Sequence, residues 1–185
     1  MNKKILALAA AVVLTSPAVV CATGLGPQLN LSSNLTAGYP GNFWGLSCSA
    51  KFNSMPVYWS LSADTGDYTY KDSDNSSVKT SFLRTTLTGD YWVMNPTIKG
   101  IWKWYWGFGG TVSTTVSADW DLYLSVGPRA VIGMNWHFLD GFLELYTQGA
   151  FQPEIEFAFG SDGSANGIVR TPVYFPFNIG VRFWF

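Results

Sequence analysis

The sequence predicts an all-β fold, an eight-stranded antiparallel up-and-down transmembrane β-barrel, and three observations favour it. Apolar residues recur at every second position over long segments, whereas the helical period is nearly absent. Charged residues make up only 12% of the chain and aromatic residues 17%, so little charge is available for a surface in water. The chain also ends on FNIGVRFWF, which alternates between apolar and other residues as a strand does.

The first segment, residues 1–22, has the features of a secretory signal peptide. Lys3 and Lys4 give it a positive start, and residues 5–14 form an apolar run that is too short to span a bilayer. Small residues before position 23 allow cleavage after Ala22. We therefore expect two parts, a signal peptide at 1–22 and an outer-membrane barrel at 23–185.

The cysteines leave one alternative open for this segment. Cys21 could instead be lipidated and become the new amino terminus, although Val20 precedes it where such processing needs a small residue. If Cys21 leaves with the signal, Cys48 remains alone and cannot form an internal disulfide. No later apolar run approaches 18 residues, so no membrane helix is expected.

Alternation then marks eight strands in order along the chain. Most are 9 to 17 residues long, whereas ordinary strands have about five or six. About ten residues are enough for a tilted strand to cross a membrane. The predicted strands cover residues 24–32, 42–52, 56–65, 81–94, 101–117, 120–135, 141–157 and 174–185.

The connections between these strands alternate in length. Short turns are expected at 53–55, 95–100 and 136–140, and longer loops at 33–41, 66–80 and 161–171. The short turn at 117–119 is the exception on the long-loop side. Short turns at one rim and longer loops at the other are typical of outer-membrane barrels.

Each predicted strand has one apolar face and one face that carries its charges. The apolar face includes Leu124 and Phe183 and is expected to contact lipid, where a Lys or Arg at mid-bilayer would cost about 2–4 kcal/mol. The charges all fall on the opposite, inward face: Lys51, Asp64, Arg84, Asp90, Lys103, Asp121, Arg129, Glu144, Glu154, Glu156 and Arg182.

A soluble, lipocalin-like carrier would show the same alternation with its apolar face inside. Three features favour the membrane barrel instead. Glycine is frequent on the charged face, which leaves room in a narrow lumen, and the chain ends in a strand. Trp and Tyr gather near strand ends, as expected of interfacial girdles, at Trp44, Trp59, Tyr91, Trp92, Trp102, Trp120, Trp136 and Trp184.

The terminal strand must pair with the first strand, because an open sheet edge cannot lie in hydrocarbon. Its alternate apolar residues and its final aromatic residue resemble the signal that the outer-membrane assembly machinery recognises. This predicted assembly signal consists of Phe177, Ile179, Val181, Phe183 and Phe185.

Four stretches resemble a known family: residues 88–113, 127–138, 142–148 and 177–185. They are similar to a small set of largely uncharacterised spirochaetal envelope proteins, predicted to be OmpA/OmpX-like eight-stranded barrels. The resemblance covers about residues 80–185, and the first half matches only in pattern. It implies an outer-membrane location, with porin, host-factor-binding or adhesin roles proposed for relatives, and no catalytic residue.

Enzymatic signatures are missing from the sequence. His137 is the only histidine and falls in a predicted turn, which makes a metal site or a Ser-His-Asp triad improbable. No phosphate-binding glycine loop precedes a helix. We expect no enzyme, no cofactor and no metal, and the net charge of −1 gives no reason to expect nucleic acid.

The inward charges are interpreted as an internal network of ion pairs, with a charged pore lining as the alternative. Five basic residues face six acidic ones, and this near balance favours pairing, since an eight-stranded barrel is only wide enough for its own side chains. The proposed interior network comprises Arg84, Asp90, Lys103, Arg129, Glu144 and Arg182.

The expected function is that of a bacterial outer-membrane barrel with a structural or surface-binding role. Its expected partners are membrane lipid, the outer-membrane assembly machinery and a surface ligand bound by loops 65–79 and 160–172. The protein is expected to be a monomer. Two alternatives stay open, a narrow porin-like channel for small solutes or ions and a soluble carrier of an apolar ligand.

Overall fold

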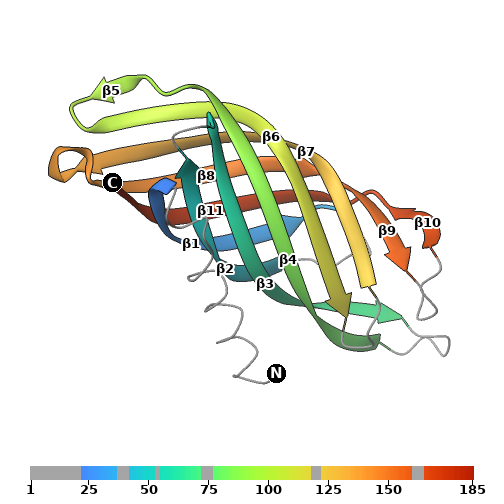
Figure 1. The fold of residues 1–185 in the computed structure, drawn as a ribbon. Helices are drawn as coiled ribbons and strands as arrows, with labels where there is room; N and C mark the ends of the chain where they lie inside the picture. Colours follow the sequence, from blue (N-terminus) through green and yellow to red (C-terminus); the bar gives the residue numbers. More distant parts are fainter. Residues whose placement is uncertain (1–21, 37–41, 53–54, 72–76, 118–121, 160–164) are drawn as a thin grey trace.

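The structure is a computed structural model that describes residues 22–36, 42–52, 55–71, 77–117, 122–159 and 165–185. In this range the chain forms one antiparallel β-barrel with a single short 3-10 turn, η1 (Leu139–Gly141) (Figure 1). No helix in the described part of the chain combines the length and the apolar content needed to cross a bilayer.

Eleven strand segments make up the eight strands of the barrel. β8 and β9 both pair with β7, so they are two parts of one barrel strand. β10 pairs with β9 and β11 pairs with β8, so β10 and β11 are likewise two parts of the last barrel strand. β5 is a short segment that pairs with β6 at a turn. The segments are β1 (Ala22–Asn34), β2 (Asn42–Phe52), β3 (Val57–Lys71), β4 (Ser77–Met94), β5 (Thr97–Lys99), β6 (Trp102–Ser117), β7 (Leu122–Phe138), β8 (Leu143–Pro153), β9 (Ile155–Phe159), β10 (Ala165–Arg170) and β11 (Val173–Trp184).

The barrel closes between its last strand and its first. β11 pairs antiparallel with β1, with Phe183 opposite Leu25 and Phe177 opposite Leu31. β6 pairs with β7 along its whole length, so no break opens between the two halves of the sheet. Closure removes the unpaired backbone edge that an open sheet would expose, and the predicted pairing of the last strand with the first is confirmed.

The two faces of the barrel have the predicted sidedness. Arg129 and Glu144 are 4% and 0% exposed inside the barrel, whereas Phe183 on the outer face is 38% exposed. Large apolar side chains that cover the outer face include Leu46, Leu61, Leu87, Phe108, Val112, Ile132, Phe151, Phe177 and Ile179. A soluble carrier would need the reverse arrangement, because its apolar residues would line the lumen.

The predicted loop at 66–80 is wrong, because β3 continues to Lys71 and β4 already begins at Ser77. The two strands stay in register to Lys71 and Ser77, so they form a hairpin arm that extends past the ends of β6 and β7 (Figure 1). Backbone hydrogen bonds hold such an arm together without an apolar face. Its polar sequence therefore lacked the alternation that revealed the other strands.

Four further predicted elements differ from the structure. The predicted turn at 136–140 begins later, since β7 runs to Phe138 and places His137 in a strand. The predicted loop at 160–172 contains β10, and the predicted turn at 95–100 contains β5. The single predicted strand at 141–157 is interrupted at Glu154, whose amide nitrogen donates to the carbonyl of Pro172 at 2.9 Å.

Several predictions concern residues outside the described part of the chain. The signal peptide lies there apart from Ala22, the first residue of β1, and Cys21 lies there with it. Trp120, Asp121 and residues 72–76 and 160–164 of the predicted ligand-binding loops also lie outside it. Cys48 is described as a free cysteine on β2.

Candidate functional site in the barrel lumen

Three ion pairs between arginine and carboxylate side chains lie inside the barrel. Arg84 pairs with Glu154 at 2.6 Å, Arg129 with Asp90 at 3.1 Å and Arg182 with Glu144 at 2.7 Å. None of these six side chains is more than 6% exposed. Arg84 and Arg129 pair with carboxylates on strands that are not their neighbours in the sheet. Arg182 and Glu144 are directly opposite each other on the neighbouring strands β11 and β8.

The pair nearest the short turns is held by a complete set of donors. Glu144 accepts hydrogen bonds from the amide of Asn135 at 2.7 Å, from Arg182 at 2.7 Å and from the indole Nε1 of Trp184 at 2.9 Å. Arg182 also donates to the hydroxyl of Ser49 through Nε and Nη2. A buried carboxylate with three donors and a paired guanidinium meet the condition under which buried charge is tolerated.

Aromatic rings surround this pair, and we call Arg182 and these rings the aromatic plug. Tyr58, Trp92 and Tyr105 form a continuous stack with ring-centre distances of 3.7 and 3.6 Å. Tyr146 and Trp184 are the other two aromatic residues around Arg182. The Arg182 guanidinium lies 4.3 Å from the ring centre of Tyr146 and 4.8 Å from the ring centre of Tyr58. These distances are within the range for cation–π attraction.

Glycines on neighbouring strands make room for two of the rings. A Cβ atom at Gly180 would overlap the ring of Tyr146, and a Cβ atom at Gly133 would overlap the ring of Tyr105. Tyr105 and Tyr146 are 0% and 1% exposed. The absence of a side chain on β7 and β11 therefore decides how closely the plug fills the lumen.

A second layer of hydrogen bonds lies at mid-barrel around Arg129. Asp90 accepts from Gln148 at 2.9 Å, and Gln148 in turn accepts from the Tyr105 hydroxyl at 3.0 Å. Arg129 also donates to Gln152, whose amide donates to Glu154 at 2.7 Å. These contacts connect the plug to the pair formed by Arg84 and Glu154.

A third group of polar side chains lines the wall formed by β1 and β3. Asn30 donates to Asp64 at 3.1 Å and Ser62 donates to the same carboxylate at 2.6 Å. Gln28 donates to Asn30 and accepts from the Tyr146 hydroxyl at 2.8 Å. The predicted inward charge of Asp64 is thus held by neutral donors.

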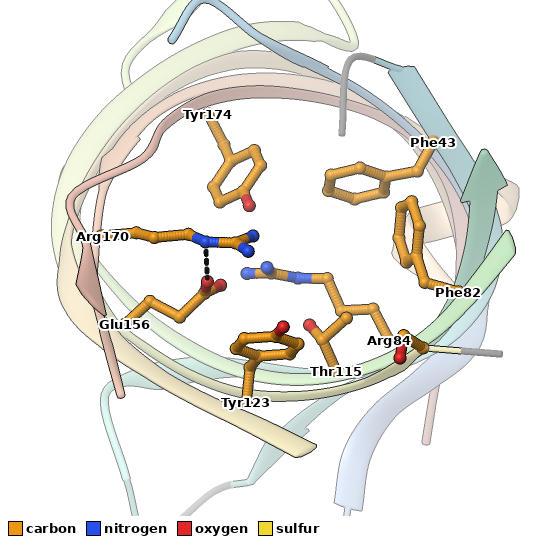
Figure 2. Close-up of a pocket in the computed structure, with 9 residues that line it drawn as sticks. Phe43, Phe82, Arg84, Thr115, Tyr123, Glu156, Arg170 and Tyr174 are labelled. Carbon is orange, nitrogen blue, oxygen red and sulfur yellow. Dashed lines mark ion pairs between the residues drawn. The ribbon is translucent and has the colours of Figure 1, made fainter. Parts of the chain in front are cut away.

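The rim opposite the short turns contains a small pocket whose lining residues come from seven strand segments. Figure 2 shows these side chains converging on the pocket. Arg84 and Arg170 point toward its centre, and Arg170 lies 3.5 Å from Glu156 (Figure 2). The Arg84 guanidinium lies 4.6 Å from the ring centre of Tyr174, and that of Arg170 lies 4.9 Å from the ring centre of Tyr123. Both cations therefore have an aromatic ring and a carboxylate beside them.

The structure places the predicted network residues as follows. Arg84, Asp90, Arg129, Glu144 and Arg182 are buried in the lumen, each in an ion pair. Lys103 is different, because it is half-buried near the start of β6 and forms no ion pair with any described residue. A position so close to the rim lets its amine reach water.

Two residues of the predicted aromatic girdles lie elsewhere, so that prediction is wrong for them. Trp92 is stacked between Tyr58 and Tyr105, and Trp184 donates to Glu144, so both belong to the aromatic plug. Both lie at even positions, on the charged face of their strands. A position near a strand end does not by itself place a Trp in the girdle, because the parity of the position decides whether the side chain points outward or into the lumen.

The residues of the predicted assembly signal all lie on the outer face of β11 or just after it. Phe177, Ile179 and Phe183 are 44%, 47% and 38% exposed, and Phe185 is 79% exposed. Val181 is half-buried on the same face. Phe142 lies beside the end of this row, with ring-centre distances of 5.9 Å to Phe183 and 6.2 Å to Phe185.

Sequence reasoning missed the neutral members of the lumen. Asn135, Gln148 and Gln152 form hydrogen bonds to members of the ion pairs, and Tyr105 and Tyr146 are buried in the same lumen. They share the parity of the charged residues, and that is the signal that could have identified them. Only charged residues were chosen as candidates, although any polar or aromatic side chain on that face enters the lumen.

The charged side chains of the three ion pairs in the lumen neutralise one another. In the described part of the chain no group of three or more His, Cys, Asp or Glu side chains could hold a metal ion. The lone His137 lies 3.9 Å from Glu144 and 3.1 Å from the Asn135 amide. The site can therefore fix the positions of the strands relative to one another.

The comparisons with known proteins concern the fold. No protein-family model and no curated protein sequence matches the chain. Among solved structures, Neisserial surface protein A (NspA) is similar with a TM-score of 0.53 and 10% identity, over 88% of this chain and 96% of that one. The amino-terminal β-barrel domain of Pseudomonas aeruginosa OprF matches with a TM-score of 0.45 and 12% identity, over 88% and 98% of the two chains.

A third match is a major outer membrane protein of Thermus thermophilus, with a TM-score of 0.37 and 9% identity over 87% and 99% of the two chains. At these identities the similarity concerns the fold alone, and the similarity to NspA carries that conclusion. The chain has the closed eight-stranded fold of outer-membrane barrels, so the predicted fold class is confirmed. The resemblance to spirochaetal envelope proteins has no support among these matches.

Proposed function

We propose that the chain is an integral barrel of a bacterial outer membrane with a structural or surface-binding role. The observation that carries this proposal is the inversion of the usual distribution of residues. Ion pairs and amides fill the inside of the barrel, whereas leucine, isoleucine and phenylalanine cover its outside. Such an outer face is unfavourable in water and favourable in hydrocarbon.

The lumen supports a role that does not involve transport through the barrel. Each of the three central arginines already has a carboxylate within 3.1 Å, so the interior offers no excess charge for selecting an ion. The aromatic plug occupies the end near the short turns. We infer that the interior network stabilises the closed barrel.

The remaining parts of the proposal concern partners. The exposed row from Phe177 to Phe185 is the surface that the outer-membrane assembly machinery would recognise, and the lipid bilayer is the main partner of the outer face. A surface ligand would bind at the rim that carries the hairpin arm and β10, in the regions 65–79 and 160–172. The barrel would act as a monomer.

A narrow channel for small solutes or ions is the second candidate. Two polar cavities inside the lumen favour it, with volumes for water centres of about 20 and 30 Å³. They are small and lie on one side of the plug, whereas conduction requires a path past it. The structural role therefore comes first.

Extraction and electrophoresis test the main proposal. The protein should remain in the membrane fraction until detergent is added, and unheated and boiled samples should migrate differently on a gel, since a detergent-resistant barrel is more compact than an unfolded chain. Release by salt without detergent, as from a soluble carrier, would refute the proposal. Reproducible conductance steps in planar bilayers would instead favour the channel.

A further inference from the structure

The two cavities of the lumen differ in depth. The first is lined by Ser117, the last residue of β6, by Tyr123 near the start of β7 and by Arg170 at the end of β10. All of these lie at the rim that carries the hairpin arm, which we call the loop rim, and Figure 2 shows Tyr123 and Arg170 beside this cavity. This cavity therefore lies at the loop-rim end of the lumen.

The second cavity lies deeper. It is lined by residues from the middle of their strands, among them Ser62, Thr88 and Gln152, and only Phe43 and Pro176 of its lining are apolar. Arg84 and Phe43 border both cavities, so these two side chains form the wall between them. A row of two polar spaces thus leads from the loop rim into the barrel.

Unpartnered polar groups face both spaces. The hydroxyl of Thr115 borders the first cavity, and the hydroxyl of Ser32 borders the second. These residues are 8% and 6% exposed, and neither hydroxyl has a hydrogen-bond partner among the described residues. Farther along β6, the buried hydroxyls of Thr111 and Ser113 also have no hydrogen-bond partner among the described residues.

Buried polar groups without a protein partner are ordinarily satisfied by ordered water. A cavity needs about 10–15 Å³ for the centre of one water molecule, together with two to four polar partners. The first cavity, at about 20 Å³, holds one water by this measure and the second, at about 30 Å³, holds two. Their volumes and linings meet both conditions.

We propose that the lumen is a hydrated vestibule that opens at the loop rim and is closed at the other rim by the aromatic plug. Water and small ions enter from the loop rim, pass the wall formed by Arg84 and Phe43 and stop at the plug. The plug residues Arg182, Tyr105 and Tyr146 have at most 2% of their surfaces exposed, so they fill the lumen at this end of the vestibule. The intact barrel therefore admits small polar species from one side and does not conduct them.

This inference deepens the proposed function and rests on the membrane barrel, and cysteine accessibility tests it. Three serines, Ser117 at the entrance, Ser32 beside the deeper cavity and Ser49 against the plug, are each replaced by cysteine in a chain that also carries Cys48→Ser. The probe is Ag⁺, a bare cation of about the size of water. Reaction at positions 117 and 32 should be at least tenfold faster than at position 49.

Each outcome has a definite meaning. A protected cysteine at position 32, or equal rates at positions 32 and 49, would overturn the vestibule. The gel assay of folded and boiled samples is run on every variant. It reports on the membrane barrel separately, because the barrel can persist when the vestibule is absent.

A second variant opens the plug. Trp92→Ala removes the central ring of the stack, and it should raise the Ag⁺ rate at position 49 to that at position 32 and produce conductance steps in planar bilayers. Trp136→Ala is the matched control, because Trp136 lies outside the barrel against Trp102, and it should leave position 49 protected. If the Trp92→Ala barrel folds and the cysteine at position 49 stays protected from Ag⁺, the proposed role of the plug is refuted. If this variant does not fold, the Ag⁺ rates at positions 117, 32 and 49 in the otherwise unchanged barrel test the vestibule.

Discussion

Glu144 shows how much one buried side chain can contribute in this lumen. Its carboxylate has no exposed surface and accepts hydrogen bonds from Asn135, Arg182 and Trp184. We predict that Glu144→Ala lowers the free energy of unfolding by about 3–5 kcal/mol, because the Arg182 charge would remain buried without its partner. Urea unfolding of the barrel in lipid vesicles measures this change.

The matched control for Glu144→Ala is a pair on the outside of the hairpin arm. Lys79 and Asp67 lie 2.9 Å apart with side chains that are 69% and 48% exposed. Lys79→Ala should change the free energy of unfolding by about 0–1 kcal/mol, as exposed ion pairs do. Equal effects of the two substitutions would contradict the interior network.

At the scale of elements, contact between β8 and β11 depends on a missing side chain. A Cβ atom at Gly180 would overlap the ring of Tyr146, whereas one at Gly149 would meet nothing within 4 Å. We predict that Gly180→Ala lowers the free energy of unfolding by about 1–3 kcal/mol through overpacking, and that Gly149→Ala is neutral or slightly stabilising. Urea titrations of both variants in the same lipid provide the comparison, and a neutral Gly180→Ala would argue against the close packing of the plug.

The hairpin arm of β3 and β4 gives a prediction about pH. Hydrogen bonds from Lys79 and Ser81 hold the pKa of Asp67 below its usual value. Because the pKa in the folded arm is lowered, the contribution of this carboxylate to stability is present above the pKa of the unfolded chain and is lost as the pH falls through the folded pKa. NMR titration should find the Asp67 pKa below the ordinary value, and Lys79→Ala should raise it, whereas an unchanged pKa would mean that the ion pair does not form in solution.

The elements that sequence could predict are those that meet two different media. β2, β6 and β7 alternate because one face forms the apolar outer surface and the other lines the polar lumen, and their predicted bounds are close to the observed ones. The sequence of the hairpin arm is polar at both parities and carries no such contrast. Parity alone identifies the lumen face, whereas the partners of Arg182 depend on strand register and could not be derived from it.

At the scale of the whole molecule, the position of the lipid belt can be tested by moving one charge along its surface. Ile132 lies near the middle of β7 and is 60% exposed, whereas Ile98 lies in the β5 turn and is 51% exposed. Arginine at mid-bilayer costs about 2–4 kcal/mol and near an interface about 0–1 kcal/mol. We therefore predict that Ile132→Arg lowers the free energy of unfolding in vesicles far more than Ile98→Arg does, although the two isoleucines are similarly exposed.

The comparison is decisive because a barrel in water would not distinguish the two positions. There an arginine in place of either exposed isoleucine would remove apolar surface from solvent at no electrostatic cost, and the two variants would behave alike.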